Sequence, residues 1–183
     1  MRPVIVAVLI FVAVLGLRAS GAFDPGPPKL DPNDARFNPA GQVVGTKQKD
    51  EGRGHVANDK TVSYGTTPPT SGDHWDTPAA WGSYDRQQPN ERTVHNLEHG
   101  GIVVSYNGLT PDDEKQLKAV VSQLRSGTFR KILIQPYPTL NDAKIAVTAW
   151  SWLLKLQTVD ETQIVQFIRA HTDGPDSPEP GVG

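Results

Sequence analysis

Two histidines in the segment VHNLEHGG, residues 94–101, have the spacing of a metal-binding pair. His95 and His99 are four residues apart, so both imidazoles project from the same face of a helical turn. Two rings placed in this way lie close enough to hold one ion. The sequence therefore predicts a metal or small-ligand site with this pair at its centre.

Two further histidines extend the candidate ligand set to four. His55 and His74 lie upstream in a loop-rich half, and they reach the pair only if the loops fold back over it. Taken singly, each is typical of a surface or hydrogen-bonded histidine. Imidazole suits Zn(II), Cu(II) and Ni(II), while the lack of Cys and of any internal Met argues against a soft Cu(I) site. We therefore expect His55, His74, His95 and His99 to bind Zn or Cu.

Glu98 lies between His95 and His99 in the sequence, and its position is consistent with several roles. It can orient an imidazole from behind, serve as a ligand, or act as a general base. Residues 95–99 also match the HxxEH pattern of inverzincin peptidases, in which the glutamate activates water. Gly100 and Gly101 end the helix at once, which argues against a peptidase. A salt bridge from Glu98 to a residue such as Arg92 is the structural alternative.

Three aromatic side chains lie in the loop that precedes the histidine pair. Trp75, Trp81 and Tyr84 belong to residues 65–89, where neither a helical nor a strand period is visible. Tryptophans indicate an ordered loop, because a disordered segment gains nothing from them. The three rings either line a groove for a sugar or peptide ligand or pack in the core of an irregular lobe, and we favour packing.

The remaining pattern predicts an α+β fold in which a small, mainly antiparallel sheet carries helices on one face. Thr110 caps the clearest helix, which has Pro111 at its first position and ends at Gly127. We expect the second and third strands to form a hairpin across residues 136–142. The predicted elements are a helix at 91–99 capped by Asn90, strands at 102–106, 131–135 and 144–150, an amphipathic piece from 152 to 156, and a last helix from 160.

The N-terminal segment, residues 1–22, is typical of an export signal. Its apolar run from Val4 to Leu17 is shorter than the roughly 20 residues that a membrane-spanning helix needs. Small residues from Ser20 to Ala22 offer a cleavage site, whereas Arg18 favours an uncleaved membrane anchor. Either interpretation places the rest of the chain outside the cytoplasm.

The rest of the chain divides into one domain and two polar flanks. Residues 23–51 are rich in Pro, Gly, Asn and Asp and predict a disordered linker. A globular domain follows at residues 52–171, and the proline-rich residues 172–183 predict a disordered tail. The chain has 18 basic and 20 acidic residues, so we expect no nucleic-acid partner. Without cysteine, disulfides and thiolate metal sites are excluded.

Four motifs together resemble a family of small bacterial extracytoplasmic proteins known only as a domain of unknown function. They are PPTSGDHW at 68–75, WGSYD at 81–85, VHNLEHGGIVVSY at 94–106 and AVTAW at 146–150. The resemblance covers roughly residues 54–170 and implies an exported or membrane-tethered protein. It maps the motif histidines onto His55, His74, His95 and His99, and it implies no particular activity.

Three functions remain open on the sequence alone. The leading hypothesis is a metal-binding module of the cell envelope, in which the four histidines bind the ion and Glu98 orients one of them. A zinc-dependent hydrolase would use three of these histidines with Glu98 as base, because catalysis needs an open coordination position. In the third hypothesis, the aromatic loop binds a cell-wall ligand or an envelope protein, and no metal is involved.

Overall fold

The computed structural model describes residues 29–37 and 44–183, and it has the α+β fold that the sequence predicts. The predicted signal peptide or membrane anchor at residues 1–22 lies outside the described residues. Within the two described ranges, no helix combines the length and the apolar character that a membrane crossing requires.

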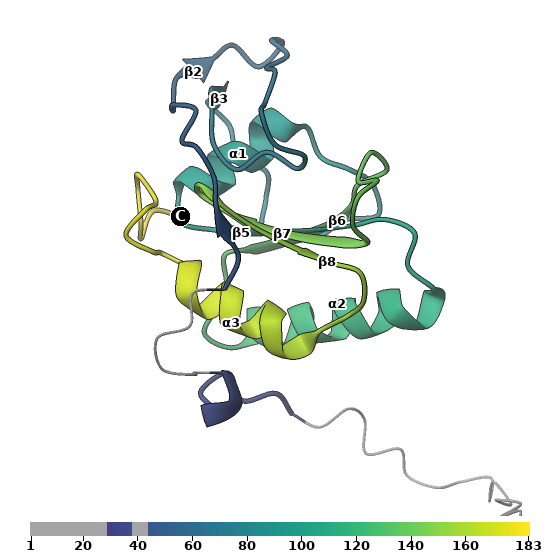
Figure 1. The fold of residues 1–183 in the computed structure, drawn as a ribbon. Coiled ribbons are helices and arrows are strands. Elements are labelled where there is room, and N and C mark those ends of the chain that lie inside the picture. Colours follow the sequence, from purple (N-terminus) through teal and green to yellow (C-terminus); the bar gives the residue numbers. More distant parts are fainter. Residues whose placement is uncertain (1–28, 38–43) are drawn as a thin grey trace, which may run out of the picture.

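One sheet of six strands organises the fold (Figure 1). Its strands lie in the order β1-β8-β7-β5-β6-β4, in which the pairs from β1 to β5 are antiparallel and β5, β6 and β4 run parallel. The sheet is therefore mainly antiparallel, as predicted. The strand bounds are β1 Thr46–Lys47, β4 Gly82–Ser83, β5 Ile102–Tyr106, β6 Ile132–Pro136, β7 Ile145–Ala149 and β8 Trp152–Leu156.

Helices cover both faces of this sheet, which corrects the prediction that they lie on one face. Figure 1 shows α2 and α3 on one face, whereas α1 lies on the opposite face beside a separate pair of short strands, β2 and β3. The bounds of these elements are α1 Asn90–Glu98, α2 Pro111–Ser126, α3 Glu161–His171, β2 His55–Val56 and β3 His74–Trp75, and a short 3-10 helix spans Ala35–Phe37. The irregular segments gather on the face that α1 occupies.

Strand β5 is buried on both of its faces and supports both layers. Ile102 and Val104 belong to the larger hydrophobic cluster, which includes residues of α2 and α3. Val103 points the other way and packs in a smaller cluster with Val94 and Leu97 of α1. A strand covered on both faces has a continuous apolar sequence, and the run IVVSY at residues 102–106 has this character. Helix α1 therefore rests on a strand that is buried along its whole length.

The two long helices begin where the sequence predicts. The side chain of Thr110 accepts a hydrogen bond from the backbone N–H of Asp113 at the start of α2. The side chain of Asp160 accepts one from Gln163 at the start of α3. Asn90, in contrast, does not cap α1: it is the first helical residue, and its side-chain oxygen accepts a hydrogen bond from the hydroxyl of Tyr137.

The predicted hairpin across residues 136–142 is wrong. Helix α2 connects β5 to β6 as a crossover, so β6 lies parallel to β5 on one side. Strand β7 pairs antiparallel with β5 on its other side, which separates β6 from β7. The hairpin is formed instead by β7 and β8, which are joined by Trp150 and Ser151. The piece at residues 152–156 is thus a strand.

Parts of both polar flanks are ordered, which corrects the predicted linker and tail. In the linker, β1 pairs with β8 and forms one edge of the sheet, and Phe37 packs in the larger cluster with only 2% of its surface exposed. In the tail, Asp176 accepts hydrogen bonds from the side chains of Lys47 and Trp152 at 2.7 and 2.8 Å. Composition predicts disorder for these segments, but specific pairing and ion pairs anchor them to the sheet.

Candidate metal centre

Two of the candidate histidines lie opposite each other on β2 and β3. These short strands pair in parallel, and the register aligns His55 with His74. Backbone hydrogen bonds from Gly72 to Gly52 and from His74 to Gly54 hold the two segments together at 2.9 Å. Directly paired residues point to the same face of a sheet, so the two imidazoles meet, with ring centroids 4.7 Å apart.

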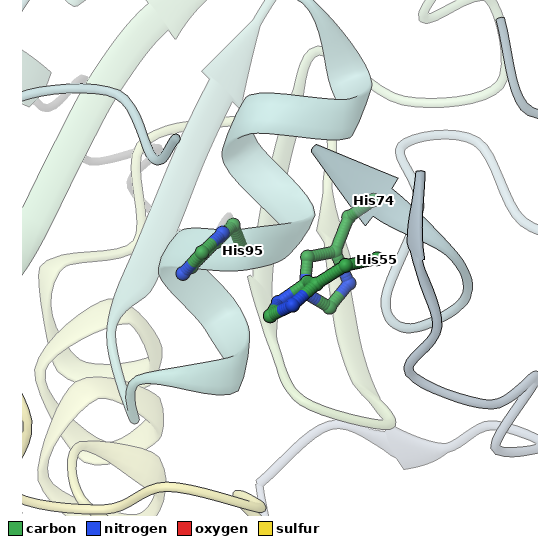
Figure 2. Close-up of side chains that lie close together, drawn as sticks. All are labelled: His55, His74 and His95. Atoms are coloured by element: carbon green, nitrogen blue, oxygen red, sulfur yellow. The ribbon is translucent and has the colours of Figure 1, made fainter. Parts of the chain in front are cut away.

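Helix α1 adds the third imidazole from the other side. The ring of His95 lies 5.2 Å from that of His55 and 5.0 Å from that of His74, measured between centroids. Figure 2 shows His95 on the helix and the other two histidines on the adjoining strand segments. One ring nitrogen from each residue lies within 4.8 Å of the others. The histidine triad, His55, His74 and His95, could therefore hold a metal ion.

The outer nitrogen of each triad ring faces an oxygen atom. Nδ1 of His74 lies 2.9 Å from the carbonyl oxygen of Gly72, and Nδ1 of His95 lies 2.6 Å from that of Trp75. Nδ1 of His55 lies 3.4 Å from a carboxylate oxygen of Asp76. A carbonyl oxygen can only accept, so it holds the proton on Nδ1 and leaves the lone pair on Nε2. This is how metal-binding histidines are usually oriented.

Glu98 places its carboxylate directly on the inner side of the triad. Its Oε2 atom lies 3.0 Å from Nε2 of His74 and 3.5 Å from Nε2 of His55. The side chain is only 4% exposed. Because backbone oxygens already occupy the Nδ1 positions of His74 and His95, Glu98 sits among the ligand atoms rather than behind an imidazole. Arg92 is not its partner, since that guanidinium donates to the carbonyl oxygen of Pro78.

His99 lies at one side of the triad and forms a second group with two of its neighbours. Its Nε2 atom lies 3.0 Å from Nε2 of His95, and the ligand atoms of His95, Glu98 and His99 lie within 4.8 Å of one another. His99 is not in the group formed by His55, His74 and His95. The four histidines thus make two overlapping groups that share His95, and no single group contains all four.

The centre is buried on the helix side and open at one strand. His74 is fully buried and His95 is 5% exposed, whereas the side chain of His55 is 47% exposed. Burial lowers the pKa of His95 and of His99 below the usual value for histidine. Their imidazoles are therefore neutral at pH 7, which is the form that binds metals.

Glycines and a tryptophan fix the position of α1 relative to the sheet. Gly100 has φ +79°, the left-handed conformation predicted at the end of the helix. A Cβ atom on Gly101 would lie 2.2 Å from the ring of Trp81, so the aromatic loop packs against bare backbone there. The edge of His74 meets the buried ring of Trp150 at 6.2 Å between centroids. Packing thus limits the movement of both sides of the centre.

The three aromatic residues of the predicted groove are placed in different surroundings. Trp81 and Tyr84 pack against the smaller hydrophobic cluster, which agrees with a packing role. Trp75 donates its indole N–H to the carbonyl oxygen of Lys60 and lines a shallow groove with Arg92. Binding of a cell-wall ligand or protein by these residues stays a prediction.

Two residues beside the centre were not among those predicted from the sequence. Asp76 lies only two positions after His74, and this spacing on an extended segment could have been noticed. Glu179, whose Oε2 atom lies 3.6 Å from Nε2 of His99, comes from the tail, and its sequence surroundings carry no signal. Its backbone N–H donates to the carbonyl oxygen of Glu98 at 3.0 Å, which fixes it beside α1.

The comparison with protein families covers the whole of this centre. The profile of a family described as Protein of unknown function (DUF3105) matches residues 55–183, from the first histidine to the end of the tail. No curated protein and no solved structure matches the chain. None of these comparisons assigns a chemistry to the centre.

Proposed function

We propose that this chain, which belongs to the family of proteins of unknown function DUF3105, is a metal-binding protein whose ion is held by His55, His74 and His95. One observation is the main support for this metal site. The three Nδ1 atoms face oxygen atoms outside the triad, so the three Nε2 lone pairs remain on its inner side. Among the described residues, no hydrogen bond joins these three rings to one another, whereas an ion between them would bind all three.

Zinc(II) is the ion that fits this set of donors best, with Cu(II) as the second choice. Both ions accept neutral imidazole, and zinc sites combine imidazole with a carboxylate readily. Glu98 supplies that carboxylate 3.0 Å from Nε2 of His74. Its negative charge also offsets part of the charge of a divalent ion in this buried position. We therefore assign Glu98 as the fourth ligand.

Hydrolysis is a second candidate function, and the exposure of His55 favours it. With 47% of this side chain exposed, a water molecule or a substrate can reach the centre from the β2 side. In that case Glu98 would accept a proton from water instead of binding the ion, and the ion would polarise the substrate. The direct approach of Glu98 to two imidazoles favours the ligand role.

We also propose that the protein acts outside the cytoplasm. The support is the sequence of residues 1–22, with its apolar run and small residues at the expected cleavage site. Fractionation of cells that produce the tagged chain tests this location, and the N-terminal sequence of the purified protein distinguishes a cleaved signal from an anchor. Recovery of the uncleaved chain in the cytoplasm would contradict the proposal.

The metal site is tested by elemental analysis and by calorimetric titration of the purified protein with Zn(II) and Cu(II). We expect tight binding in the wild type and a large loss of affinity in His55→Ala and His95→Ala. His55 is half-exposed, so its variant should fold normally even if that of His95 does not. The matched control is His171→Phe, which removes an imidazole on α3. A folded wild-type protein that binds neither metal would refute the site.

A further inference from the structure

Beside the triad lies a set of ligand-type side chains that the proposed site does not use. His99 places Nε2 next to the triad, and Glu179 of the tail places Oε2 3.6 Å from that nitrogen. His99 also shares a group with Glu98 in which the ligand atoms lie within 4.8 Å of one another. The imidazole of His99 at the end of α1 therefore has a carboxylate of Glu98 and a carboxylate of Glu179 near it.

His95 cannot serve both groups at the same time. Its Nδ1 atom faces the carbonyl oxygen of Trp75, so only Nε2 has a free lone pair, and a neutral imidazole binds one ion through one nitrogen. Glu98 differs, because a carboxylate has two oxygen atoms. Among the described residues, its contacts with His55 and His74 are made by Oε2, which leaves Oε1 for a second ion.

We propose that His99, Glu98 and Glu179 hold a second divalent metal ion next to the first, with the carboxylate of Glu98 bridging the two. The inference rests on the proposed function, since it assumes an ion in the triad. Two carboxylates also supply the negative charge that a second dication needs beside the first. In proteins with two-metal sites the ions are about 3.5–4 Å apart, a separation that one bridging carboxylate spans.

The tail holds Glu179 in place without help from a metal. Its backbone N–H donates to the carbonyl oxygen of Glu98, and the backbone N–H of Asp173 donates to the carbonyl oxygen of Gly100. Lys131 reinforces this docking, because its ammonium group donates to Asp173 at 2.8 Å and to the carbonyl oxygen of His99 at 3.1 Å. Glu179 is thus positioned beforehand, which reduces the entropy lost when an ion binds.

The second ion should exchange more easily than the first. The side chain of Glu179 is 48% exposed, whereas His74 and Glu98 of the first site are almost completely buried. An exposed ligand is easily replaced by water, so the second ion binds more weakly. We therefore expect a titration with two phases, in which the weaker phase depends on Glu179 and the stronger one does not.

The experiment is a calorimetric Zn(II) titration with elemental analysis, performed on the wild type and on Glu179→Gln. We expect two ions per chain in the wild type and one in the variant, with the tight phase unchanged. Glu161→Gln on α3 is the matched control and should keep both ions. His99→Ala should behave as Glu179→Gln does. Paramagnetic resonance of the Cu(II)-loaded wild type should show two magnetically coupled ions, and the variant should show an isolated one.

The outcomes separate this inference from the proposed function. A wild type that binds one ion, with an affinity that Glu179→Gln leaves unchanged or weakens, overturns the second site but keeps the first. A second ion that persists in Glu179→Gln and in His99→Ala lies elsewhere, and this too overturns the inference. A wild type that binds no ion would overturn the triad site itself.

Discussion

His74 and Glu98 face each other across 3.0 Å, with Nε2 of the ring directed at Oε2 of the carboxylate. The other nitrogen of the same ring lies 2.9 Å from the carbonyl oxygen of Gly72. Both oxygens accept hydrogen bonds, but a neutral imidazole has only one N–H to donate. The second contact needs an additional proton or a cation shared by nitrogen and oxygen. A metal ion bound by both atoms meets this need between two buried side chains.

Replacing Glu98 tests whether its carboxylate binds the ion. We expect Glu98→Gln to weaken Zn(II) binding at least about tenfold, because the amide carries no charge and is a poorer ligand. Competition with a chelator of known affinity measures the change in zinc affinity. Glu161→Gln, the same substitution at a residue of α3, is the control. If affinity were unchanged while a hydrolytic activity disappeared, Glu98 would be the base and not a ligand.

Asp76 supports His55 through Nδ1, at a distance of 3.4 Å. We expect Asp76→Asn to lower zinc affinity about tenfold, as is common when a partner of a ligating histidine loses its charge. Asp59→Asn, at an exposed aspartate in the preceding turn, is the control and should bind zinc as the wild type does. Equal affinities in all three proteins would show that His55 needs no such partner.

His171 makes the stability of the fold depend on pH. Burial lowers its pKa, although a contact of Nε2 with the carbonyl oxygen of Val44 and the charge of Asp176 act in the opposite direction. The unfolded chain therefore binds a proton more readily, at a pKa of about 6.5. The stabilising contribution is complete above this pH and is lost as the pH falls through the lower pKa of the folded protein.

Urea denaturation of the metal-free protein between pH 7.5 and 5 should show this loss. His171→Phe should reduce the slope of unfolding free energy against pH, because it removes one of the groups concerned. Part of the slope should remain, since burial also lowers the pKa of His95 and of His99. Identical slopes in the variant and the wild type would assign the pH dependence to other residues.

Gly100 connects the end of α1 to the tail, and alanine should not be tolerated there. Its φ of +79° disfavours any side chain, and a Cβ would lie 2.9 Å from Cα of Asp173. We expect Gly100→Ala to destabilise the protein by more than the roughly 1–2 kcal/mol of the unfavourable backbone conformation alone. Gly108→Ala separates the two effects, because Gly108 has φ +62° but a Cβ added there would meet no atom within 4 Å. Equal losses in thermal denaturation would argue against close docking of the tail.

Local signals in the sequence predicted the helices and the central strand well. Thr110 and Asp160 cap α2 and α3 through bonds to residues three positions away, which a sequence displays directly. Strand pairing depends on distant residues instead. The crossover through α2 and the position of β7 on the other side of β5 could therefore not be predicted from the sequence. The order of the tail was also missed, because Asp173 and Asp176 are bound by residues remote in sequence.

The candidate centre was predicted in its residues but not in its grouping. The spacing of His95 and His99 identifies the helix face, and the structure places their Nε2 atoms 3.0 Å apart. Which histidine completes the group depends on the register that aligns His55 with His74, and no local pattern encodes that register. The approach of Glu98 to the ligand atoms likewise follows from the docking of α1 on β5.

The parallel pairing of β2 with β3 has a further consequence for how this half of the protein holds together. Each strand has only two residues, and the segments around them contain little of the hydrophobic core. An ion bound at His55, His74 and His95 would act as a cross-link between three distant stretches of chain. It would suppress local unfolding of these short strands, and amide hydrogen exchange in residues 52–76 would slow far more than in the central sheet.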